Sequence, residues 1–286
     1  MKRFLALTLA AVAARAAPPF EFRDITPESV ELVEGSSPVY VYHHGAVHRT
    51  GAPAELARCC YLHPVYTPAG TVVTDDFPED HYHHRGIFWA WPVVVVGAQR
   101  FDGWVLRGLR PRFGRWLARE AGATQARLAV ENAWMAGDRP VVRETVEIVA
   151  FPASEGRREL RFRLSFEALG APIELRGEPT QAKGYGGFSV RFAPRRQTVI
   201  LTDAGRESAD SDMVPHRWAA LEAVFAGRRA SLRIDIDPAH PGFPNGWCLR
   251  HYGFLGVNFP GLISYRLEPG RPLELRYKVT LSDLSR

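Results

Sequence analysis

The histidines of this chain are concentrated in one short stretch of the sequence. Seven of the ten fall within residues 43–84. Three of these share a run of four residues, at His81, His83 and His84. An imidazole can exchange a proton or bind a metal ion near neutral pH. Such a cluster therefore indicates a functional site rather than an ordinary solvent-exposed surface. This segment is therefore the first candidate for the functional site of the protein.

Two kinds of chemistry suit the cluster. In an extended backbone, His81, His83 and Arg85 project to one side, and Tyr82 and His84 project to the other. Two imidazoles on one side can bind a divalent transition metal, with an aspartate nearby as a further ligand. The alternative needs no metal: a histidine acts as general acid or base while Arg85 binds a substrate carboxylate or polarised oxygen. Each residue taken alone could also simply bond to loop carbonyls.

Glu144 is the candidate for a catalytic carboxylate. In the strand predicted around it, Glu144 shares the apolar face with Val142 and Val146. A carboxylate on the inner face of a sheet has a raised pKa that suits acid or base chemistry, unless a partner in the core pairs with it. The sequence leaves both interpretations open.

Four further side chains suit the binding of a sugar. Arg250 and Tyr252 share one face of a predicted strand, and Tyr185 lies in a glycine-rich turn where the backbone can approach a ligand closely. Trp89 follows the histidines in an apolar run. Aromatic faces stack on sugar rings, and a guanidinium binds hydroxyls or a uronate carboxylate. These residues, with Arg85, are the predicted substrate-binding groups.

The elements that must position these residues read as short strands separated by turns. Residues 160–166 alternate strictly between apolar and polar side chains, as a half-buried strand does. The 25 glycines and 22 prolines favour turns between these strands. The pattern predicts an all-β fold, a large β-sandwich with few or no helices. Only residues 113–121 read as weakly helical. No repeat or linker interrupts residues 17–286, so we predict a single domain there.

Residues 1–16 have the pattern of a signal peptide. Lys2 and Arg3 precede an apolar run, and an A-x-A cleavage pattern ends at Ala16. This pattern predicts a periplasmic or secreted protein. Removing the three basic residues of the segment lowers the formal net charge from +5 to +2, which does not favour nucleic acid as a partner. The remaining chain has no apolar stretch long enough to span a membrane.

Three cysteines are too few for a disulfide framework. Because neighbouring strand residues point to opposite faces, at most one of Cys59 and Cys60 is expected to face Cys248.

Four segments together resemble a bacterial family labelled methane oxygenase PmoA-like. They read HPVYTPAG, DDFPEDHYHHRGIFWAW, GYGGFSVRF and FPNGWCLRHYGFLGVN. The resemblance spans most of the chain after the signal peptide, and its most specific part is DHYHHRG. It implies an extracytoplasmic β-sandwich akin to the mutarotase-like sandwiches that handle sugars.

The sequence therefore predicts an exported enzyme that acts on a sugar or uronate, with His81, His83 or His84 and Glu144 as acid and base. Epimerisation, elimination and hydrolysis all remain open. Two alternatives also remain: a metal-dependent, oxygenase-like enzyme on the same histidines, and a non-catalytic carbohydrate-binding module.

The signal-peptide pattern makes a direct prediction about the exported protein. Cleavage after Ala16 should give a chain that begins at Ala17. N-terminal sequencing of protein recovered from the periplasm or medium checks this. A chain that retains Met1 in the cytoplasm would contradict it.

Overall fold

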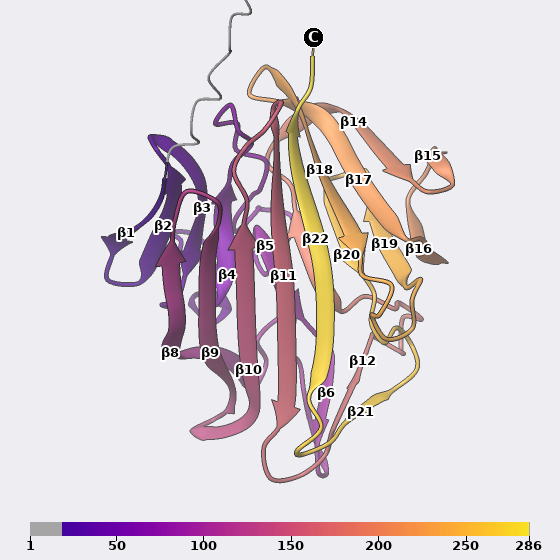
Figure 1. Cartoon of the computed structure of the whole chain (residues 1–286). Helices are drawn as coiled ribbons and strands as arrows, with labels where there is room; N and C mark the ends of the chain where they lie inside the picture. Colours follow the sequence, from indigo (N-terminus) through magenta and orange to yellow (C-terminus); the bar gives the residue numbers. More distant parts are fainter. Residues whose placement is uncertain (1–18, 286) are drawn as a thin grey trace, which may run out of the picture.

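Two antiparallel sheets of nine strands face each other across one apolar core (Figure 1). The computed structural model describes residues 19–285, so the predicted signal peptide lies outside the described residues. Within residues 19–285 the one helical element is the short 3-10 turn η1 (Ala54–Leu56). No helix in this range is long and apolar enough to cross a membrane. The predicted all-β sandwich is confirmed.

The spatial order of the strands within each sheet differs from their order along the chain. From edge to edge, sheet 1 contains β1 (Phe20–Thr26), β2 (Ser29–Glu34), β3 (Ser37–His43), β4 (Tyr61–Val65), β5 (Ile87–Ala90), β13 (Gly187–Arg191), β20 (Phe254–Val257), β19 (Gly246–Arg250) and β16 (Ser211–Pro215). Sheet 2 contains β15 (Gly205–Glu207), β14 (Arg195–Thr202), β17 (Trp218–Phe225), β18 (Arg228–Ile236), β22 (Leu273–Asp283), β11 (Arg157–Ala168), β10 (Arg139–Ala150), β9 (Ala126–Ala136) and β8 (Leu109–Ala121). A small sheet 3 contains β21 (Tyr265–Leu267), β12 (Ile173–Arg176), β6 (Val93–Val96) and β7 (Gln99–Phe101).

The long strands of sheet 2 follow the alternation that the sequence predicts. Figure 1 shows β8, β9, β10, β11 and β22 side by side. Phe162 and Leu164 of β11 are buried and lie opposite Tyr277 and Leu275 of β22. Polar neighbours on the same strands point away from the core. Each strand of this pair therefore gives one face to the core and one to solvent.

Residues 113–121, expected to be weakly helical, belong instead to strand β8. This strand lies at the edge of sheet 2 and pairs with β9. Its register shifts between Phe113 and Arg115 and again between Trp116 and Ala118. Such bulges interrupt the two-residue period by which a strand is recognised in a sequence.

Sheet 1 carries apolar side chains on both of its faces. Leu62 and Ile87 point into the core between the sheets. Their neighbours Tyr61 and Phe88 point to the outer face, where they join a second buried cluster with Trp104. The other buried members of this second cluster are Ala90, Cys248 and Phe254. The outer face of sheet 1 thus offers an apolar platform that other parts of the chain must cover.

The adjacent cysteines do not point to opposite faces. Cys60 has a φ of 64°, which breaks the strand alternation on which that expectation depends. The Sγ atoms of Cys59 and Cys60 therefore lie 3.0 Å apart. Both thiols are free and buried, as is that of Cys248.

A buried ion pair connects the two large sheets. Arg158 at the start of β11 is 1% exposed, and its Nη2 lies 2.7 Å from the carboxylate of Glu34 at the end of β2. The carboxylate also accepts the backbone N–H of Ala153. Removing one member of such a pair leaves an uncompensated charge in the interior.

We expect Arg158→Ala to lower the free energy of unfolding by about 3–5 kcal/mol, because Glu34 would lose its buried partner. Urea denaturation measures the change. The matched control is Arg161→Ala, three positions along the same strand, where an exposed ion pair contributes about 1 kcal/mol or less. Similar small losses in both variants would contradict the prediction.

Candidate functional site

The histidine segment covers the apolar platform on the outer face of sheet 1. The ring of His84 lies 4.8 Å from that of Phe254 and 6.1 Å from that of Phe88, measured between centroids. Gly86 lets the segment pass directly into β5, because a Cβ at this position would collide with the carbonyl oxygen of Leu62. The histidines are thus held between a loop and a rigid strand.

The segment is folded into two successive turns. The N–H of His81 donates to the carbonyl of Pro78 at 2.9 Å, and the N–H of His84 donates to that of His81 at 2.8 Å. The prediction of an extended segment, with His81 and His83 on one side and His84 on the other, is therefore wrong. Tight turns bring residues three apart close together, so His81 and His84 become neighbours.

His81 lies between two parallel rings. Its imidazole is 4.6 Å from that of His84, with 1° between the planes, and 5.3 Å from the ring of Tyr252, with 11° between the planes. His83 meets His84 edge-on at 4.6 Å. Tyr252, in the turn after β19, is 41% exposed, and the His81 side chain is 36% exposed. The structure brings the three histidines and Tyr252 together, with His81 and Tyr252 partly exposed and His84 buried beneath them.

Asp80 connects this stack to sheet 1. Its carboxylate lies 3.1 Å from His81 Nδ1 and accepts two hydrogen bonds from Arg191 Nη2, at 2.7 and 2.8 Å. Burial opposes the ionisation of Asp80, but the bonds from Arg191 and His81 outweigh it and lower the pKa of the carboxyl. The guanidinium also lies 4.9 Å from the ring of Tyr252. Asp80 is therefore an anion at neutral pH, positioned to orient His81.

Arg191 has unused hydrogen-bonding capacity next to the histidines. Its side chain is buried, yet Nε and Nη1 have no hydrogen-bond partner among residues 19–285. The buried Nδ1 of His84 is likewise unpaired among these residues. Buried donors and acceptors are seldom left unpaired, so these atoms indicate a place where a ligand or water completes the bonding.

Arg85 does not face this surface, which corrects its predicted role in substrate binding. It is fully buried, and it donates to the carbonyls of Tyr82 and His84, both at 2.7 Å, and to that of Leu56. Its guanidinium also lies 3.5 Å from the centre of the Phe77 ring. Arg85 therefore holds the histidine segment in shape from within.

Asp76 belongs to the same internal support. It accepts the hydroxyl of Tyr61 at 2.8 Å and lies 3.4 Å from Arg85 Nε. Burial raises the pKa of Asp76 to about 6, although Arg85 and the Tyr61 hydroxyl act in the opposite direction.

Glu144 lies on the wrong side of sheet 1 to act with the histidines, which corrects its predicted catalytic role. It projects from β10 into the core between the sheets and is 1% exposed. Its carboxylate accepts the indole N–H groups of Trp89 at 2.9 Å and Trp134 at 2.7 Å, and the amide of Asn132 at 2.8 Å. Trp89 is thereby also a core residue and not a surface for substrate. Burial raises the pKa of Glu144.

Arg250 and Tyr185 are placed differently from each other. Arg250 donates to the carbonyl of Ser211 and lies 3.7 Å from Asp212, on the β16 side of sheet 1. Tyr185 packs against Trp104 at 4.9 Å, and Trp104 in turn lies 6.4 Å from His83. Tyr185 thus joins the aromatic border of the site, whereas the contacts of Arg250 are made with β16.

The described residues give little support to a metal at this site. Within residues 19–285 no group of three or more histidine, cysteine, aspartate or glutamate side chains is arranged to hold a metal ion. His81 and His83 meet at a centroid distance of 5.6 Å without a third side-chain ligand from this range. Two ligands do not define a transition-metal site.

Sequence reasoning did not select Arg191 or Phe254. Both lie in segments that carry the family resemblance. Arg191 could have been found by alternation, because Ser189 and Arg191 are the outward residues between Phe188, Val190 and Phe192. That it meets Asp80 depends on the path of a loop, which alternation does not predict.

The fold and the site together define the class of protein. It is an all-β sandwich with a histidine-bearing loop over one outer face. Residues 29–285 match the family described as "Family of unknown function (DUF6807)", and the chain belongs to this family. No curated protein matches the chain significantly.

Solved structures with some similarity include carbohydrate-active enzymes. The heparan sulfate lyase HepC of Pedobacter heparinus has a TM-score of 0.41 and 7% identity, over 90% of this chain and 34% of that one. A heparinase III has a TM-score of 0.39 and 8% identity, over 96% of this chain and 36% of that one. A GalM/aldose epimerase homologue of C. elegans has a TM-score of 0.39 and 6% identity, over 93% and 100%. The chain spans about a third of either lyase, and likenesses this distant carry no information on its activity.

The burial of His83 predicts a pH dependence of stability. Burial, followed by the charges of His81 and Arg58, lowers the pKa of His83 to about 4. A lowered histidine pKa means that the folded state binds the proton less tightly than the unfolded state. The stabilisation is therefore complete above pH 6.5 and is lost as the pH falls towards 4.

As the pH falls from 6.5 to 4, the free energy of unfolding should decrease more steeply for the wild type than for His83→Gln. The two slopes should differ by up to about 1.4 kcal/mol per pH unit. Urea denaturation at a series of pH values measures this, with His48→Gln, at an exposed position, as control. Parallel pH profiles for the wild type and His83→Gln would show the prediction to be wrong.

Proposed function

We propose that this protein is a carbohydrate-active enzyme in which His81 performs acid–base chemistry on a sugar or uronate. The observation that carries the proposal is the arrangement of His81 itself. Its ring is partly exposed and stacked on Tyr252, and its Nδ1 lies 3.1 Å from the carboxylate of the ionised Asp80. A carboxylate on one imidazole nitrogen fixes the tautomer and leaves the other nitrogen free to accept a proton.

Arg191 supports the uronate form of this proposal. Two nitrogens of its guanidinium are unpaired within residues 19–285. A guanidinium with free N–H groups can bind a carboxylate, or a sugar oxygen that gains negative charge during the reaction. Asp80 accepts hydrogen bonds from Arg191 and lies 3.1 Å from His81 Nδ1, so one carboxylate lies next to both the anion-binding group and the base.

The aromatic surface supports a sugar as the substrate. Tyr252 presents an exposed ring over which the apolar face of a pyranose can stack. Burial raises the pKa of Tyr252 to about 12, so its hydroxyl stays protonated and can donate a hydrogen bond or a proton. Tyr185 and Trp104 extend the aromatic border next to His83.

The first chemical step that these groups suit is removal of a proton from the carbon next to a uronate carboxylate. His81 Nε2 takes the proton, and the C–H electron pair moves into the carboxylate, whose added charge Arg191 offsets. Expulsion of the oxygen substituent on the next carbon, which takes a proton from the Tyr252 hydroxyl or from water, then gives an elimination product. Return of a proton from water to the opposite face of the carbon gives an epimer instead.

We expect the purified protein to convert a uronate-containing oligosaccharide, and His81→Gln to lower kcat by about 100-fold or more. Asp80→Asn should also lower kcat, because the tautomer of His81 is no longer fixed. Proton NMR of a panel of neutral and uronate oligosaccharides follows both elimination and epimerisation. His48→Gln, on an exposed loop, is the matched control and should retain full activity.

The same panel separates the alternatives. Activity that a chelator abolishes and added metal restores would favour a metal-dependent enzyme. Binding that Tyr252→Ala weakens, without turnover of any member of the panel, would favour a non-catalytic binding module. Full activity of His81→Gln would remove His81 from the proposal.

A further inference from the structure

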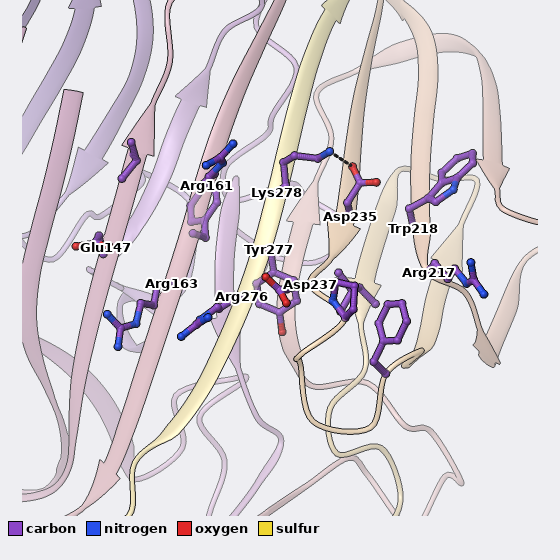
Figure 2. A pocket seen from close by; sticks show the side chains of 15 residues that line it. Glu147, Arg161, Arg163, Arg217, Trp218, Asp235, Asp237, Arg276, Tyr277 and Lys278 are labelled. Carbon is purple, nitrogen blue, oxygen red and sulfur yellow. Dashed lines mark ion pairs between the residues drawn. The ribbon is translucent and has the colours of Figure 1, made fainter. Parts of the chain in front are cut away.

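A second candidate site lies on the opposite side of the sandwich, on the solvent-facing surface of sheet 2. A groove of about 910 Å³ runs over β11, β22 and β18 and is bounded by the start of β17 and the loop that follows β18. Figure 2 shows Arg161, Arg163, Arg276 and Lys278 on neighbouring strands, with Trp218 across the groove. The histidine site is on the outer face of sheet 1, so the two sites are separated by the full thickness of the sandwich.

The groove has more positive than negative side chains. Five cationic and three anionic side chains line it. Glu274, beside it, is bonded to both Arg163 and Arg276. Asp235 is likewise bonded to Arg233 and lies 3.6 Å from Lys278.

In each of these two clusters, one carboxylate is shared by two cations. Over the groove lining as a whole, five cationic side chains against three carboxylates leave an excess of two positive charges. An oxyanion of a ligand could complete either cluster with charge-assisted hydrogen bonds.

The spacing of the cations is that of a strand. Residues two apart on a strand are separated by roughly 7 Å, which applies to Arg161 and Arg163 and to Arg276 and Lys278. Two parallel rows of this kind suit an extended polymer that carries anionic groups at intervals. A single small anion would use only one position of the rows.

Two aromatic side chains are among those that bound the groove. Trp218 is half-buried, and the guanidinium of Arg233 lies 3.8 Å from the centre of its ring. Phe243, which is partly buried, also lines the groove, whereas the ring of Tyr277 is buried in the core between the sheets. Flat rings next to guanidinium groups suit a ligand whose apolar ring faces alternate with charged substituents, as in a polysaccharide.

We propose that this groove binds an anionic polysaccharide, through its carboxylate or sulfate groups, independently of the histidine site. Duplex nucleic acid fits less well, because it presents about one negative charge per 1.7 Å of its axis. Three carboxylates in the groove would face that charge. Widely spaced anionic groups with hydroxyls between them can avoid those carboxylates.

Isothermal titration of the mature protein with polygalacturonate, dextran sulfate and uncharged dextran tests the proposal. We expect binding to at least one of the two anionic polymers, weakening as salt is added, and no binding to dextran. Arg161→Gln combined with Arg276→Gln should lower the affinity at least tenfold. Which anionic polymer binds separates carboxylate from sulfate recognition.

The control removes the same charge elsewhere: Arg100→Gln combined with Arg266→Gln, at two exposed positions on sheet 3. This variant should bind as the wild type does, and thermal unfolding should show both double variants folded. An equal loss in the control, binding of dextran, or no binding at all would overturn the proposal. Tighter binding of duplex DNA than of either anionic polysaccharide would also overturn it. So would light scattering that shows a dimer of the wild type which the groove variant alone fails to form.

Discussion

A carboxylate enclosed between two sheets must be hydrogen-bonded, and the way Glu144 meets this requirement determines much of the structure. Its donors come from both sheets: Trp134 and Asn132 from β9, and Trp89 from β5. The bond to Trp89 fixes β5 against sheet 2. The preceding residue on that strand, Phe88, then points outward and supports His84. A polar contact in the core thus sets the position of a surface loop on the far side of the sheet.

The histidine segment is organised around a cation in its own interior. Arg85 bonds to three carbonyl groups of the surrounding loops and packs against Phe77. Because a buried guanidinium tolerates few alternative arrangements, the two turns before it have little freedom. This rigidity allows His81, Asp80 and Arg191 to keep a fixed geometry. Arg85 thus serves the site by structure and not by contact with a ligand.

The sequence predicted the fold better than the site, for a physical reason. Alternation reports which face of a strand is buried, and it identified β10 and β11 correctly. It also placed Glu144 on an inner face, but it could not show that two indoles and an amide would satisfy the carboxylate there. The histidine cluster was recognisable from composition alone. Its geometry was not, because turns beginning at Pro78 replaced the extended backbone that we assumed for His81 and His83. The ion pair of Asp80 with Arg191 joins positions 111 residues apart and leaves no local signal.

The apolar platform under the histidines links the evolution of this protein's chemistry to its folding. Phe88, Phe254 and Trp104 are shielded from water by rings that also form the site, chiefly that of His84. A substitution that adapts the site to another ligand therefore also changes how well sheet 1 is covered. Selection then acts on the solubility of variants of this surface before it acts on their activity. Diversification within such a family is expected to proceed through residues at the border of the platform, such as Tyr185, sooner than through those at its centre.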